Sequence, residues 1–167
     1  VIPTGQGAAG YTMPLPEKDE MHLTRGKMLQ DITVCLGGRV AEGIAFDDVT
    51  TGAVQDIRQA TEAARDMVTK YGFSEELGMI NYSTSDDEVF IGRDIGHKKD
   101  FSESTSELID REVKKIIDQC HEKAVKLLKE NTDILNRLAQ LLIEKERIGQ
   151  EEFEALFEQN DDTDAQF

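Results

Sequence analysis

The amino-acid sequence predicts a mainly α-helical domain with a small, minor β component. Aromatic residues make up only 6% of the 167 residues and Trp is absent, so the core must consist mainly of Leu, Ile, Val, Met and Ala. Side chains of this kind suit helices. In several segments the apolar residues also recur every three or four positions, which is the spacing of an amphipathic helix.

The first helix is predicted over residues 24–44. Thr24 can cap its N-terminus, and its apolar residues at helical spacing are Met28, Ile32, Cys35, Leu36, Val40 and Ile44. Gly37 and Gly38 lie in its middle, where each costs about 1 kcal/mol relative to Ala. We therefore expect another backbone to approach the helix closely at these two residues.

A loop at residues 45–52 leads into a second predicted helix over residues 53–71. Gly72 supplies a C-terminal stop for this helix. Its predicted buried residues are Ala53, Ile57, Ala60, Ala64, Met67 and Val68. The small side chains among them predict tight packing.

Three further helices are predicted after an irregular segment that holds two short candidate strands, at residues 79–82 and 89–91. Residues 104–107 have the Ser-x-x-Glu pattern of a capping box and open a long helix that ends near Lys129. Asn131 or Thr132 caps the next helix, and a last short helix contains Phe153, Leu156 and Phe157. We expect one domain over residues 1–157 and an acidic, disordered tail over residues 158–167.

Residues 1–20 are predicted to be extended, because they contain several glycines and because Pro14 and Pro16 exclude a helix interior. Residues 11–13 form a candidate strand, bounded by Gly10 and Pro14. A strand next to Pro is found mainly at the edge of a sheet, where its free backbone groups can pair with an extended peptide. An ordinary strand that leads into a loop explains the same pattern.

The formal net charge of −15 excludes some classes of partner. A surface this acidic argues against binding to nucleic acid, which requires clustered Lys and Arg, and against binding to an anionic membrane. No run reaches the roughly 18 apolar residues of a membrane span, and no signal peptide is recognisable.

Cys35 and Cys120 have no CxxC partner and are predicted to be buried, reduced thiols. The chain begins with Val, in what reads as mid-strand, so we expect a fragment of a longer protein.

Asp56 is the most informative residue of the second predicted helix. With a rotation of about 100° per residue, its carboxylate lies on the same line as Ala60, Ala63 and Met67. A carboxylate that shares a buried face requires a cation, a metal or several N–H donors. A first-turn Asp that is favoured by the helix dipole is the alternative interpretation.

Several short motifs occur in a fixed order along the chain. They are Gly-Tyr-Thr at residues 10–12, Gly-Gly-Arg-Val-Ala-Glu at 37–42, Phe-Asp-Asp-Val-Thr-Thr-Gly-Ala-Val-Gln-Asp-Ile at 46–57, Tyr-Gly-Phe-Ser at 71–74 and Phe-Ile-Gly-Arg at 90–93. In content and spacing this series resembles the peptidase domain of the FtsH-type AAA metalloproteases, a family of ATP-dependent zinc proteases. The resemblance covers residues 1–157.

The resemblance implies a zinc site with three protein ligands, two His of an HExxH helix and one Asp of a later helix, at the position of Asp56. Such a site leaves one position open for water, as a catalytic zinc requires, and the Glu of HExxH takes the proton from that water. The resemblance also implies that Gly10, Tyr11 and Thr12 border the cleft as the edge strand that pairs with the substrate backbone.

The sequence contains no HExxH motif, and none of its three histidines has another histidine four residues away. The family places HExxH shortly before the segment with which this chain begins, so the general base is expected upstream of Val1. We therefore expect the chain alone to have no peptidase activity and to bind zinc poorly.

Glu42 is the rival acidic residue for the zinc site. The family often has two consecutive acids at this place, whereas this chain has Glu42 followed by Gly43. Glu42 could instead orient a zinc-binding His from outside the ligand set. We rank Asp56 above Glu42 as the ligand.

The resemblance implies an intact protein that is a membrane-anchored, hexameric protease of unfolded and membrane proteins, on the cytoplasmic side of the inner membrane or its organellar equivalent. ATP would bind only to an upstream domain, because this chain has no P-loop. Two alternatives remain at this point. The chain could be a non-catalytic helical oligomerisation module, or part of a pseudoprotease that has lost its zinc motif.

Overall fold

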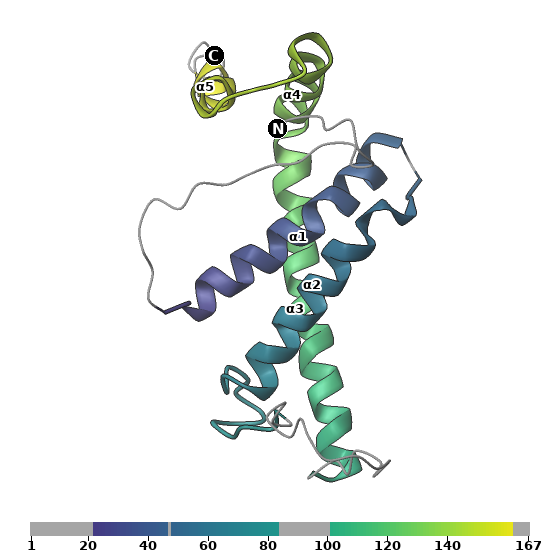
Figure 1. Cartoon of the computed structure of the whole chain (residues 1–167), viewed down its shortest axis with the longest axis vertical. Helices are drawn as coiled ribbons and strands as arrows, with labels where there is room; N and C mark the ends of the chain where they lie inside the picture. The colour runs from purple at the N-terminus through teal and green to yellow at the C-terminus, as the bar shows by residue number, and fades with distance from the viewer. Residues whose placement is uncertain (1–21, 47, 84–100, 162–167) are drawn as a thin grey trace, which may run out of the picture. The chain divides into compact units, whose positions relative to one another are not determined.

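The computed structural model describes residues 22–46, 48–83 and 101–161 (Figure 1). These residues form five α-helices and one 3-10 turn: α1 (Arg25–Phe46), η1 (Thr51–Ala53), α2 (Val54–Thr69), α3 (Glu103–Glu130), α4 (Thr132–Lys145) and α5 (Gln150–Asp161). The prediction of a mainly helical fold is confirmed. The strand predicted at residues 79–82 is wrong, because this segment is irregular and Met79 is 97% exposed. The candidate strands at 11–13 and 89–91 lie outside the described residues.

The described residues divide into two compact units, 22–127 and 128–161. The first unit contains α1, η1, α2 and most of α3, and the second contains α4 and α5. None of the helices that the structure describes is both long enough and apolar enough to cross a bilayer.

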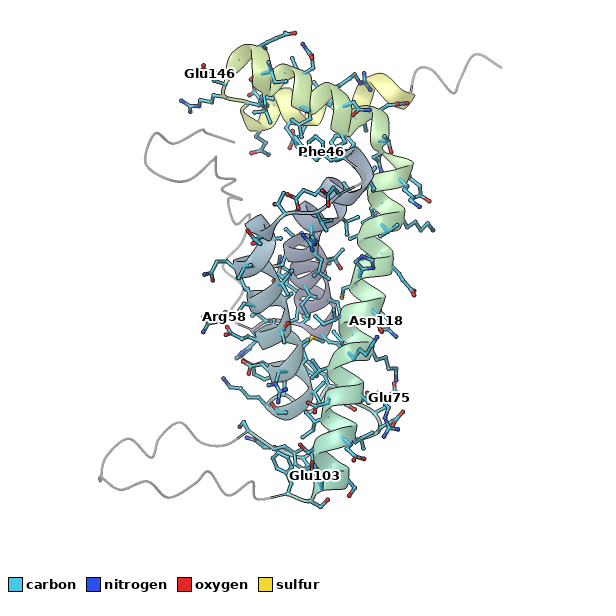
Figure 2. The ribbon with its side chains drawn as sticks, turned by 90° about the vertical axis from the view of Figure 1, so that its right-hand side faces the viewer. Phe46, Arg58, Glu75, Glu103, Asp118 and Glu146 are labelled. Carbon is cyan, nitrogen blue, oxygen red and sulfur yellow. The ribbon has the colours of Figure 1, made fainter. Side chains whose placement is uncertain are left out.

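The core of the first unit lies where α1, α2 and α3 pack together (Figures 1 and 2). Its buried residues are Met28, Ile32 and Leu36 of α1, Ala60, Ala64, Met67 and Val68 of α2, Leu77 of the following loop, and Ile109, Val113, Ile116 and Cys120 of α3. Full burial of one large apolar side chain contributes roughly 1.5–3 kcal/mol. The two alanines of α2 are completely buried, which is the tight packing that their size predicts.

Two expectations about this packing are not met among the described residues. Ile57 was expected in the buried stripe of α2 but is 41% exposed, because it lies nearly one turn before Ala60, where the buried cluster of α2 begins. No backbone approaches Gly37 or Gly38 closely, since a Cβ atom built on either would meet nothing within 4 Å among the described residues. Among the described residues, no neighbouring atom requires glycine at either position.

The ends of α1 and α2 follow the sequence signals. Thr24 caps α1, because its Oγ1 accepts a hydrogen bond from the Lys27 N–H at 3.1 Å. Helix α2 ends at Thr69, and Gly72 adopts a φ of +63° shortly beyond it. A Cβ at Gly72 would lie 3.1 Å from the Met79 Cα, so both the backbone angle and the available space favour glycine there.

The start of α3 differs from its prediction. Ser102 caps the helix, because its Oγ accepts a hydrogen bond from the Thr105 N–H at 3.2 Å. The expected capping residue, Ser104, lies inside the helix, which begins at Glu103. The earlier start moves the third helical position, where the capping bond forms, from Glu107 to Thr105.

A buried carboxylate ties the loop after α2 to α3. Glu112 accepts hydrogen bonds from the Ser74 hydroxyl at 2.8 Å and from Lys115 at 3.1 Å. The Ser74 oxygen in turn accepts a hydrogen bond from the Leu77 N–H at 3.2 Å. Figure 2 shows Glu75 of this loop beside α3.

The second unit is a pair of helices, α4 and α5. Its buried residues are Ile134, Ile148 and Leu156. Glu146 ends α4 in the left-handed conformation with a φ of 58°, and its N–H donates to the Leu142 carbonyl at 2.9 Å. Phe153 and Phe157 of α5 contact each other edge to face, with ring centroids 5.4 Å apart. Helix α5 continues to Asp161, four residues into the segment that was expected to be a disordered tail.

Candidate metal centre

Asp56 lies in the first turn of α2, where the sequence places it. The 3-10 turn η1 runs directly into this helix. Asp56 lies five positions after Thr51, the first residue of η1. Its side chain is exposed, whereas Ala60 and Met67, which share its line on the helix, are fully buried. The Asp56 carboxylate therefore stands at the open end of a buried line of residues.

The side of α2 that carries Asp56 is directed toward α1. The carboxylate acts electrostatically on Cys35 of α1: burial raises the pKa of the Cys35 thiol, and Asp56 and then Asp31 raise it further. Arg58, two residues later, points outward from α2 on the side away from α3 (Figure 2) and pairs with Glu62 at 2.8 Å. Asp56 itself has no hydrogen bond or ion pair to any residue that the structure describes. Its two oxygens are thus available to a ligand from outside this part of the chain.

The donor chemistry of Asp56 fits one position of a zinc site. Zinc accepts Asp oxygens together with His nitrogens, and a catalytic site requires three protein ligands. Within the described ranges no group of three His, Cys, Asp or Glu side chains could hold a metal ion. Asp56 can therefore supply one ligand, and the described residues do not complete the site.

Glu42 has a different environment from Asp56, because both of its oxygens have partners. Its Oε1 accepts a hydrogen bond from the Thr50 hydroxyl at 2.5 Å, and its Oε2 accepts one from the Thr50 N–H at 3.2 Å. Arg39 lies 3.7 Å from the same carboxylate. The pKa of Glu42 is lowered, first by the Thr50 hydroxyl and then by the Thr50 N–H. A carboxylate held in this way is less available to a metal than that of Asp56.

The remaining candidate strand residues and the histidines are either exposed or outside the described residues. Gly10, Tyr11, Thr12 and His97 are outside the described residues. His22 and His121 are exposed.

Sequence reasoning missed Arg39 and Thr50 as partners of Glu42. The Arg39 guanidinium donates to the Thr50 carbonyl at 2.5 Å, across eleven positions of the chain. The spacing of Arg39 and Glu42 is a recognisable helix pair, and Thr50 precedes a helical segment as a capping residue does. The first signal draws attention to Arg39 and Glu42, and the second to Thr50. Neither signal shows that Thr50 contacts the other two residues.

Comparisons with known proteins assign this helical chain to a family. The model of peptidase family M41 matches residues 1–156. The chain therefore belongs to peptidase family M41. The prediction of an FtsH-type zinc protease family is confirmed, and the family-level assignment as a metallopeptidase with it.

The chain is similar to several curated bacterial proteins. It is 48% identical over 167 residues to the ATP-dependent zinc metalloprotease FtsH 1 of Thermoanaerobacter sp., which is 100% of this chain and 27% of that protein. It is 47% identical over 156 residues to the ATP-dependent zinc metalloprotease FtsH of Caldicellulosiruptor bescii, covering 93% of this chain and 25% of that protein. It is also 42% identical over 166 residues to the FtsH protein of Thermotoga maritima, covering 95% of this chain and 27% of that protein. The chain thus spans about a quarter of the length of these relatives.

Proposed function

We propose that this chain is part of the peptidase domain of an ATP-dependent zinc metalloendopeptidase that degrades unfolded and membrane proteins. The observation that carries the proposal is the exposed carboxylate of Asp56, which has no partner among the described residues and stands at the start of a helix in an M41 chain. The names of the relatives supply the dependence on zinc and ATP.

Asp56 has the role of third zinc ligand in this proposal, beside two His of an HExxH segment that this chain does not contain. Bound zinc supplies an activated water and polarises the peptide carbonyl. In this proposal α2 carries the Asp56 carboxylate, and the helix packs into the core from Ala60 onward. The other two ligands and the general base belong to the HExxH segment. The chain alone is therefore expected to lack activity.

The proposal includes a homo-oligomer, hexameric in the intact protein, on the cytoplasmic side of the inner membrane or its organellar equivalent, with ATP bound upstream of this chain. Gly10, Tyr11 and Thr12 are proposed to pair with the backbone of an extended substrate. The non-catalytic alternatives have no observation of their own in their favour, whereas relatives at 48% and 47% identity carry the name of a zinc metalloprotease.

The test is Asp56→Asn in the full-length protein, with Asp133→Asn as its matched control. Both residues are acidic and lie in the first turn of a helix, so both substitutions remove a charge that complements the helix dipole, worth about 0.3–1 kcal/mol. If Asp56 is a ligand, only Asp56→Asn should lose bound zinc and peptidase activity. Zinc content by mass spectrometry and cleavage of a fluorogenic peptide measure the two. Full zinc content and activity in Asp56→Asn would leave Asp56 as an ordinary first-turn residue.

A further inference from the structure

Two side chains near the end of α1, those of Arg39 and Glu42, form hydrogen bonds with every polar group of a single loop residue, Thr50. The Thr50 N–H and hydroxyl donate to the two oxygens of Glu42, at 3.2 and 2.5 Å. The Thr50 carbonyl accepts from the Arg39 guanidinium at 2.5 Å. We name the set Arg39, Glu42 and Thr50 the clasp.

The clasp continues directly into the start of α2. The Thr50 oxygen that donates to Glu42 also accepts a hydrogen bond from the Gly52 N–H at 3.1 Å, which makes Thr50 the N-cap of η1. The Val54 N–H then bonds to the Thr51 carbonyl, and α2 follows without an intervening loop. An unbroken series of hydrogen bonds therefore runs from the Glu42 carboxylate to the turn that precedes Asp56.

Apolar packing contributes little to holding this turn. Of residues 51–59, Ala53 is buried and all the others are exposed, including the large side chains of Val54 at 58% and Ile57 at 41%. The buried cluster of α2 starts only at Ala60. Within the described residues, the position of the first turn thus depends on polar contacts, and the clasp supplies those that reach α1.

We infer that the clasp is a positioning device, in which Glu42 acts through Thr50 to fix the first turn of α2 and hence the place of the Asp56 carboxylate. The inference rests on the proposed function, in which Asp56 is a zinc ligand and its carboxylate must be held in position. It assigns to Glu42 a role other than that of metal ligand or partner of a zinc-binding His. A metal ligand must be held in place by its surroundings, and loss of such support typically costs about ten- to a hundredfold in metal affinity.

The experiment compares Thr50→Val with Thr50→Ser in the full-length protein. Valine has the shape of threonine but lacks the hydroxyl that links Glu42 to Gly52, whereas serine keeps it. Thr61→Val is the matched control, because the Thr61 hydroxyl also lies on α2 but bonds only to the Ile57 carbonyl of its own helix, at 2.8 Å. Zinc affinity is measured by competition with a chromophoric chelator, ligand geometry by the visible spectrum of the cobalt-substituted protein, and kcat and KM by peptide hydrolysis.

We expect Thr50→Val to weaken zinc binding about ten- to a hundredfold, to alter the cobalt spectrum and to lower kcat with KM retained. Thr50→Ser should restore these values toward those of the parent, and Thr61→Val should leave them unchanged. Glu42→Gln keeps one acceptor oxygen, so its effect should be smaller and should not add to that of Thr50→Val.

Two contrary results separate this inference from the proposed function. If Asp56→Asn loses zinc but Thr50→Val binds it as the parent does, with the same cobalt spectrum, the clasp only anchors a loop and the inference is wrong. If Asp56→Asn keeps zinc and activity, the proposed ligand is wrong and the inference fails with it. Should Thr50→Val lose its helical circular dichroism, Glu42→Gln decides, and parental zinc affinity in that variant overturns the inference.

Discussion

Glu112 is a charged residue in a core built mainly from apolar and small side chains. Its side chain is 7% exposed, and it accepts hydrogen bonds from Ser74 and Lys115. A buried carboxylate stays charged only where such partners offset its lost hydration. The attachment of the loop after α2 to α3 therefore depends on a group that titrates.

Glu112→Gln should make the stability of the protein less dependent on pH. Burial alone would raise the pKa of Glu112, but the hydrogen bonds from Ser74 and Lys115 outweigh it, so the pKa lies below its ordinary value of 4.5. A carboxyl whose pKa is lower in the folded state stabilises the fold above the unfolded-state pKa, and this contribution disappears as the pH falls through the folded-state pKa. We expect the free energy of unfolding of the parent to fall more steeply than that of Glu112→Gln as the pH drops below 4.5. At neutral pH the variant should be less stable by about 1–3 kcal/mol.

Urea denaturation at a series of pH values measures both effects. Glu107→Gln is the control, because it removes a carboxylate from an exposed position of the same helix. Parallel pH profiles for the parent and Glu112→Gln would show that Glu112 does not couple the loop to pH.

At the scale of the secondary-structure elements, the N-terminus of α3 gives a direct comparison of two serines. Ser102 makes the capping hydrogen bond to the Thr105 N–H, whereas Ser104 lies within the helix. Ser102→Ala should destabilise the protein by about 1 kcal/mol. Ser104→Ala should change its stability by less than about 0.5 kcal/mol, since alanine is the better helix former. Chemical denaturation distinguishes the two, and an equal loss in both variants would contradict the assignment of Ser102 as the cap.

The elements show what the sequence could and could not predict. The apolar spacing of α1, α2 and α3 predicts their existence and most of their buried residues, because that spacing is a property of each helix alone. It does not predict where the buried cluster of α2 begins, and Ile57 lies before Ala60, outside that cluster. The start of α3 was misplaced because Ser102 and Ser104 are both favoured N-cap residues, and only Ser104 has a Glu three positions later. The clasp was invisible for a related reason, since its bonds join residues eight and eleven positions apart across a loop.

At the scale of the whole molecule, the chemistry of the proposed site extends beyond this chain. Asp56 was predictable as a first-turn carboxylate because the second helix was predicted to begin at residue 53. Its proposed role as a zinc ligand depends on two His ligands of an HExxH motif that the sequence does not contain. The chain spans 27% of the length of its Thermoanaerobacter relative. A helical scaffold that carries a single ligand can place that ligand accurately without binding the metal strongly by itself.

Zinc binding should therefore differ sharply between the chain alone and the full-length protein. A single exposed carboxylate competes poorly with water for zinc, whereas three protein ligands enclose it in a tetrahedral site. After dialysis against a weak chelator, we expect the chain alone to retain far less than one zinc per molecule and the full-length protein to retain one. Asp56→Asn in the full-length protein is the control, because it should reduce the zinc content without removing the His ligands. Tight, stoichiometric zinc on the chain alone would mean that residues within it complete a site, and the division of the metal centre between this chain and its missing HExxH segment would then be wrong.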